Sequence, residues 1–192
     1  NRAILALLGA GLLIICGVIH QEAAFRGIDF NTIGLLMGMM IIVGITAKSG
    51  VFQYVAVWAA KKVDAQPIGV LFMMSIVTAV LSALLDNVTT VLLVVPVTLL
   101  ITEELKVKPY PYLIAEILFS NIGGTATLIG DPPNIMIGSQ VRIPFNDFIT
   151  NLAPVVLVVM VATLTSFYVI WRKELVTTDK ARQRVMEFNE SE

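Results

Sequence analysis

The longest apolar run of this chain covers residues 68–102, and only the segment 86–90 (DNVTT) interrupts it with polar side chains. A bilayer core of about 30 Å needs about 20 apolar residues in a helix. The run is therefore too long for one crossing and too short for two crossings with a turn. We predict a re-entrant helical hairpin over 68–102 with its tip at 86–90, because protein or a water-filled cavity must satisfy non-helical backbone at membrane depth.

Composition places the whole chain in the membrane. Hydrophobic residues make up 57% and charged residues 14%, whereas about a quarter of a typical soluble domain is charged. The formal net charge of −1 argues against a nucleic-acid partner. The single cysteine, Cys16, lies in an apolar run and predicts no disulfide.

The remaining apolar segments predict an all-α polytopic membrane protein. Residues 3–19 read as a span and not as a signal peptide, because no small-residue cleavage site follows them. The segment 51–63 carries aromatic residues and ends in lysines, which favours a helix lying along the membrane interface. We expect spans at 3–19, 32–47, 112–141 (broken) and 151–171, a loop at 142–150 with Asn146 or Asp147 as a cap, and a tail or linker at 172–192.

The basic residues favour one orientation of these segments. With the chain starting inside and the hairpin entering and leaving from inside, eleven of the thirteen lysines and arginines are cytosolic. Only Arg26 and Arg142 then lie outside. This skew obeys the positive-inside rule, so we expect an inner or plasma membrane protein whose C-terminal tail is cytoplasmic.

A second break, SNIGGTATLIGDPPN at 120–134, interrupts the third span. Its glycines permit backbone shapes that other residues resist, and Asp131 followed by Pro132 resembles an N-cap and a first helical residue. At the first break, Asp86 or Asn87 is expected to cap the next half-helix. A helix restarted at depth offers N–H donors for an anion, and the end of the preceding half-helix offers carbonyls for Na⁺. Discontinuous helices of this kind form the midplane sites of secondary transporters.

The charges within the apolar segments narrow the chemistry. They are Asp86, Glu116 and Asp131, with no lysine or arginine among them. Acids without a basic partner need a proton, a bound cation or partial hydration, since charge at depth is costly. This favours coupling to Na⁺ or H⁺, with no other cofactor. Glu116 is a candidate proton relay, although it can equally reach the cytosolic interface.

The two breaks and their flanks, residues 85–100 and 115–139, resemble the ion transporter superfamily with its citrate transporter-like domain. Residues 28–43 (IDFNTIGLLMGMMIIV) also resemble it. The most similar branch comprises arsenite permeases, NhaD-type sodium/proton antiporters and the P protein. Related dicarboxylate transporters carry serine where Asp86 and Asp131 stand here, which argues against carboxylate transport.

The resemblance implies two inverted repeats, each with a re-entrant hairpin and a broken helix that meet at the transport site. Residues 1–171 then form one repeat, and a missing second repeat is an expected partner. A possible sodium site falls on the same residues as the ion or substrate site. Carried onto this sequence, the site residues are Asp86, Asn87, Thr89, Thr90, Ser120, Asn121, Gly123, Gly124, Thr125, Thr127, Asp131 and Asn134.

These observations predict a segment of a secondary active transporter, for sodium/proton antiport or for efflux of arsenite or another small anion. A sodium-coupled di- or tricarboxylate transporter is the alternative. If the protein is not a transporter, we expect a non-transporting membrane scaffold. We do not expect an enzyme, because the Gly130-Asp131 pair lacks the first glycine of the intramembrane aspartyl protease motif. The expected partners are the lipid bilayer, a small inorganic ion or anion, the second repeat and a second copy in a homodimer.

Overall fold

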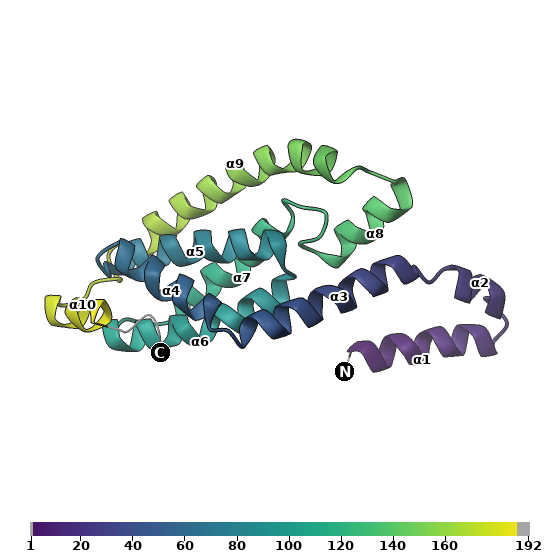
Figure 1. Ribbon diagram of the computed structural model, residues 1–192, viewed down its shortest axis with the longest axis horizontal. Coiled ribbons are helices and arrows are strands. Elements are labelled where there is room, and N and C mark those ends of the chain that lie inside the picture. Colours follow the sequence, from purple (N-terminus) through teal and green to yellow (C-terminus); the bar gives the residue numbers. More distant parts are fainter. Residues whose placement is uncertain (1, 188–192) are drawn as a thin grey trace.

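The computed structural model describes residues 2–187, and every regular element within them is a helix. The helices are α1 (Arg2–Ile15), α2 (Gln21–Arg26), α3 (Phe30–Ala47), α4 (Val51–Lys62), α5 (Pro67–Leu84), α6 (Asn87–Leu105), α7 (Tyr110–Gly124), α8 (Pro132–Val141), α9 (Phe145–Trp171) and α10 (Asp179–Met186). In Figure 1, α5 and α7 run together at the centre, α9 covers them on one side, and α4 and α6 lie on the other. The helices α1 and α2 extend away from this packed group (Figure 1).

The all-helical, polytopic class is confirmed. Four helices, α3, α5, α6 and α9, are long and apolar enough to cross a membrane. At about 1.5 Å per residue, α5 and α6 are each about 27 Å long. Their lengths suit a crossing as well as re-entry, so the re-entrant hairpin over 68–102 stays a prediction.

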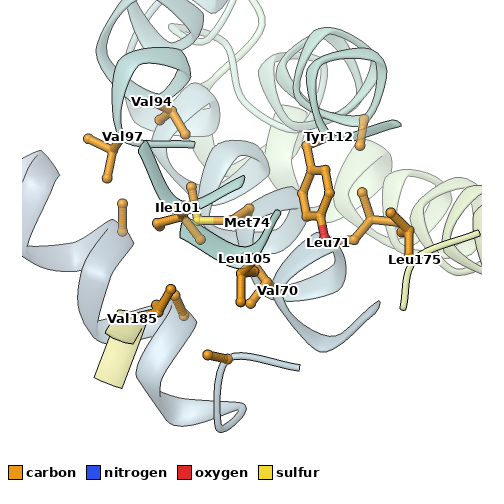
Figure 2. Close-up of a cluster of buried hydrophobic side chains, with 14 of the residues drawn as sticks. Val70, Leu71, Met74, Val94, Val97, Ile101, Leu105, Tyr112, Leu175 and Val185 are labelled. Carbon is orange, nitrogen blue, oxygen red and sulfur yellow. The ribbon is translucent and has the colours of Figure 1, made fainter. Parts of the chain in front are cut away.

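The hydrophobic core lies where α5, α6 and α7 meet. Figure 2 shows Met74 from α5 beside Ile101 from α6, with Leu105 of α6 below them, and Leu71 from α5 next to the ring of Tyr112 from α7. All five side chains are almost fully buried. The Tyr112 hydroxyl donates a 2.9 Å hydrogen bond to the carbonyl of Pro67, so the first turn of α7 is fixed to the start of α5.

At the opposite end of this core, α7 lies directly against the backbone of α5. A Cβ atom built on Gly123 would lie 2.1 Å from the carbonyl oxygen of Ala79. One turn further along α5, the Ser82 hydroxyl donates a 2.6 Å hydrogen bond to the carbonyl of Ser120. Only glycine permits so close an approach, which brings the ends of α5 and α7 together.

Two helix boundaries differ from those expected. The first helix ends at Ile15 and not at residue 19, because Gly17 adopts a left-handed conformation (φ 71°) and Val18 N–H returns to the carbonyl of Leu13. This is the pattern of a glycine C-cap. The last long helix begins at Phe145, so the loop predicted at 142–150 is shorter, and Asn146 and Asp147 lie inside the helix with Pro144 as the N-cap.

The segment after α9, which we predicted as a tail or linker, packs on the fold. Leu175, Ala181 and Val185 are buried, and α10 lies against α6 and α4. Two arginines hold it in place. Arg184 pairs with Glu104 of α6 at 3.6 Å, and Nε of Arg182 donates to the carbonyl of Asp64 at 3.0 Å.

The contact at Gly123 yields a prediction about stability. Gly123→Ala forces α5 and α7 apart, and we expect the free energy of unfolding to fall by about 1–3 kcal/mol, the usual range for overpacking. The matched control is Gly38→Ala in α3, where a Cβ atom meets nothing within 4 Å. Thermal unfolding of both variants in detergent measures the difference. Equal melting temperatures for the two variants would contradict the close approach.

Candidate functional site

A hydrogen bond joins the two predicted breaks. The Asn87 side-chain amide donates to the side-chain oxygen of Asn121 at 3.1 Å, although 34 residues separate them. Asn87 is the first residue of α6, and Asn121 lies in the last turn of α7. The two breaks therefore meet in one place, as the sequence predicts.

The first break occupies only Leu85 and Asp86 between α5 and α6. Asp86 is the N-cap of α6, and its carboxylate accepts the N–H of Thr89 at 3.0 Å, which confirms the predicted cap. The N–H of Thr90 donates to the Asp86 carbonyl, and that of Val88 donates to the Asn87 side-chain oxygen at 2.9 Å. Three of the donors in this first turn are therefore already used.

The second break is a loop between α7 and α8 that its own polar groups hold in shape. The Thr127 hydroxyl donates to the carbonyl of Ala83 and accepts the N–H of Gly130 at 3.1 Å. The Asn134 side-chain amide donates to the carbonyls of Gly124 (3.2 Å) and Thr127 (3.0 Å). Asn134 thus crosses the loop and fixes the distance between the two half-helices.

The start of α8 differs from the expected anion site. The helix begins at Pro132, as expected, but the Asp131 carboxylate accepts no capping hydrogen bond. Pro132 and Pro133 have no N–H to offer. The next two N–H groups, of Asn134 and Ile135, both donate to the carbonyl of Asp131. An anion would therefore find no free backbone donor in the first turn of α8.

Oxygen atoms dominate the joined breaks. Asp86 and Asp131 belong to the two breaks that these hydrogen bonds join, and within residues 2–187 neither carboxylate forms an ion pair. The Gly124 carbonyl at the end of α7 accepts one hydrogen bond, from the Asn134 side chain, and retains a second lone pair. Chemically, this arrangement suits a small cation.

The other predicted residues have distinct positions. Thr90, Ser120, Gly123, Gly124 and Thr127 are buried, and the hydroxyls of Thr90 and Ser120 donate to carbonyls of their own helices. The side chains of Asn121 and Thr125 instead face a cavity of about 250 Å³ between α7 and α9. Its remaining wall is apolar and comes from Ile122, Leu152, Val155, Val156 and Val159.

Glu116 lies one turn before the second break and is fully buried. It accepts a hydrogen bond from the hydroxyl of Thr98 on α6. Within this fold it does not reach a surface, so the alternative of an interfacial side chain is wrong.

Sequence reasoning missed a polar cleft at the far end of α8. Its volume is about 310 Å³, and Arg26, Arg142 and Asp29 contribute its charged groups. Hydrogen bonds from the hydroxyls of Thr32 and then Ser139 hold the pKa of Asp29 below its ordinary value. Two arginines and one aspartate therefore line the same cleft. The available signal was that the predicted topology places only these two basic residues on the outer side of the membrane.

Comparison with known proteins agrees with this geometry. Residues 1–187 match the model of the family described as "Citrate transporter" (CitMHS). The chain belongs to the citrate transporter family. The predicted membership of the ion transporter superfamily is thereby confirmed. This is a family of transporters and not of enzymes.

Three relatives match this chain over most of its length. An uncharacterized transporter of Mycobacterium tuberculosis is 48% identical over 168 residues, which cover 85% of this chain and 39% of the relative. The 46 kDa membrane protein of Mycobacterium leprae is 43% identical over 196 residues, covering 100% of this chain and 46% of the relative. The P protein of Mus musculus is 40% identical over 186 residues, covering 91% of this chain and 22% of the relative. The chain thus spans less than half the length of these relatives, and it is part of an integral membrane protein.

The Asn87–Asn121 contact of this citrate transporter family chain can be tested by a double-mutant cycle. We expect Asn87→Ala and Asn121→Ala to be non-additive, with a coupling energy of about 0.5–1.5 kcal/mol, the usual net value of one hydrogen bond. Chemical unfolding in detergent measures it. Asn151→Ala is the control, because Asn151 bonds only within α9, to the Asp147 carbonyl, and should couple to neither. Strict additivity of Asn87→Ala and Asn121→Ala would show that the two breaks do not touch.

Proposed function

We propose that this chain forms one half of a secondary active ion transporter and binds the coupling cation between its two helix breaks. Sodium/proton antiport is the leading activity, and efflux of arsenite or another small anion on the same gradient is its close variant. One observation carries the proposal. The Asn87–Asn121 and Thr127–Ala83 hydrogen bonds join the two breaks that carry Asp86 and Asp131, and neither aspartate has a basic partner among the described residues.

The hydrogen bonds around the breaks support a cation more than an anion. Both half-helices would attract an anion if their first N–H groups were free. Around α6 those groups are held by Asp86 and Asn87, and at α8 prolines and the Asp131 carbonyl remove them. Carbonyl and carboxylate oxygens remain, as in the Na⁺ sites of other discontinuous helices.

The two aspartates provide the decisive test. In the full-length protein reconstituted into vesicles, we expect Asp86→Asn and Asp131→Asn each to reduce Na⁺-driven proton movement by at least about tenfold, since losing a charged ligand typically costs more than about 1.4 kcal/mol. A pH-sensitive dye inside the vesicles reports the flux after a Na⁺ jump. Asp147→Asn, an exposed aspartate on α9, should transport normally.

The same variants separate the transporter from a non-transporting scaffold. Melting temperatures measured across Na⁺, Li⁺, arsenite and pH should rise with the coupling ion in the wild-type protein and not in Asp86→Asn. Wild-type rates in both aspartate variants, together with no stabilisation by any of these ions, would reject the proposal.

A carboxylate substrate is the second candidate, supported by the family description and by the cleft at Arg26 and Arg142. Guanidinium groups bind carboxylates with paired donors. In this reading the breaks bind the cation, and the cleft attracts citrate or a similar anion at the end of α8, about 15 Å away along a ten-residue helix.

The cleft makes its own prediction. We expect Arg26→Gln and Arg142→Gln each to raise the KM for citrate about two- to fivefold, because an exposed charge contributes about 0.5–1 kcal/mol, with kcat unchanged. Radiolabelled citrate uptake into vesicles at low ionic strength measures it. Arg172→Gln, whose guanidinium instead lies over Tyr168 of α9, is the control. A citrate KM unchanged in both cleft variants would favour an inorganic ion.

A further inference from the structure

Glu116 stands out as a buried titratable group that the cation site does not use. Its side chain is 0% exposed, and its neighbours along the buried face of α7 are Tyr112, Ala115 and Phe119. The Thr98 hydroxyl donates to one carboxyl oxygen, Oε1. The other oxygen, Oε2, is buried and has no hydrogen-bond partner among the described residues.

A second unpartnered polar atom accompanies it in the same helix group. The hydroxyl oxygen of Thr78 on α5 is also fully buried and lacks a partner among the described residues. Because α7 packs against both α5 and α6, each of the three helices contributes one buried polar side chain: Thr78, Thr98 and Glu116. Two unsatisfied oxygens in a close-packed interior need an explanation, since such groups are rare in native folds.

The charges on the packed helices do not neutralise Glu116. The sequence of α5 has no titratable residue. On α6, Glu103 is exposed and Glu104 pairs with Arg184 of α10. On α7, the Tyr112 hydroxyl donates its hydrogen bond to the carbonyl of Pro67.

The third helix that packs against α7 is α9, and it contributes no buried titratable side chain. Its titratable residues are Asp147 and Tyr168, and both are exposed. A cationic partner is therefore missing from every described helix that packs against Glu116. An ionised carboxylate without such a partner is strongly disfavoured in an apolar interior, whereas a protonated one gains an O–H donor at Oε2.

We propose that Glu116, together with Thr98 and Thr78, forms a proton-binding site that is separate from the Asp86–Asp131 cation site. One proton binds Oε2 and is released from it, and no other bond forms or breaks. Thr98 orients the carboxyl through Oε1, and Thr78 is the unpartnered buried hydroxyl that α5, packed against α7, adds to this group. This inference rests on the proposed function, since it assigns the exchanged proton to a place in the fold.

The fold links this site to the cation site through α5. Near the breaks, the Ser82 hydroxyl bonds to the Ser120 carbonyl at 2.6 Å, and Thr127 bonds to the Ala83 carbonyl. Thr78 lies one turn before Ser82 on the same helix, and Glu116 lies one turn before Ser120 on α7. A shift of α5 against α7 at the breaks therefore also changes the surroundings of Glu116.

Infrared difference spectroscopy of the purified full-length protein tests the site directly, without any transport. We expect a pH-dependent carbonyl band of a protonated carboxylic acid that is lost in Glu116→Gln, an isosteric change that keeps the packing. The band should shift in Thr98→Val and persist in Glu103→Gln, the exposed control on α6. A spectrum that is the same in Glu116→Gln and wild type would overturn the proposal.

Transport measurements then distinguish a failure of this inference from a failure of the proposed function. In vesicles, we expect Glu116→Gln to lose at least about tenfold of Na⁺-driven proton movement while Na⁺ still raises the melting temperature as in the wild type. Asp86→Asn should lose both. Normal proton movement in Glu116→Gln would refute the Glu116 site but not the cation site. If Na⁺ did not raise the melting temperature of the wild-type protein, the proposed function would be refuted, and the infrared result would be unaffected.

Discussion

The close approach of α5 and α7 at Gly123 is the constraint on which the site depends. A side chain at this position would collide with the backbone of Ala79, so glycine allows the two helices to touch near the ends where each is broken. The Ser82–Ser120 and Thr127–Ala83 hydrogen bonds extend the same contact. Asn87 and Asn121 can pair only because this contact brings the two breaks together. Without it, two polar interruptions would lie in separate parts of the membrane.

This contact gives the breaks their chemical character. Several backbone N–H groups of the restarted helices are paired locally or absent, because Asn87 and Asp86 accept those of Val88 and Thr89 and α8 begins with two prolines, which have none. Carbonyl and carboxylate oxygens are left to face an incoming ion. Our proposal that a cation binds at the breaks rests on this chemistry, and the cleft lined by Arg26 and Arg142 is the place we propose for an anion.

The rest of the surface fits a chain that works with more protein and with lipid. Outward side chains of α3 and α9 are apolar, and Ile41 and Val158 are 62% and 70% exposed. The cavity beside Asn121 is also bounded by α9 on one side. These apolar faces suit contact with the bilayer, and the chain covers less than half the length of its relatives.

Much of the site was predictable because its signals are local. Glycines and prolines that break a helix, and an aspartate that caps the next one, act within a few residues of themselves, so both breaks and the Asp86 cap followed from sequence. The features that the sequence did not predict depend on contacts between residues that are distant in sequence. The packing of α10 depends on Glu104 and Asp64, and the cleft depends on two loops more than 100 residues apart.

The sequence by itself determined the membrane class, the two breaks, the unpaired acids and the transporter family, because hydropathy and backbone preference are properties of short segments. Tertiary structure alone decided that Asn87 meets Asn121, that α8 offers no free donor to an anion, and that Glu116 is enclosed with Thr98 and not at an interface. The physical reason is that burial and hydrogen-bond partners depend on which helices pack together, and here a single glycine contact between α5 and α7 sets that packing.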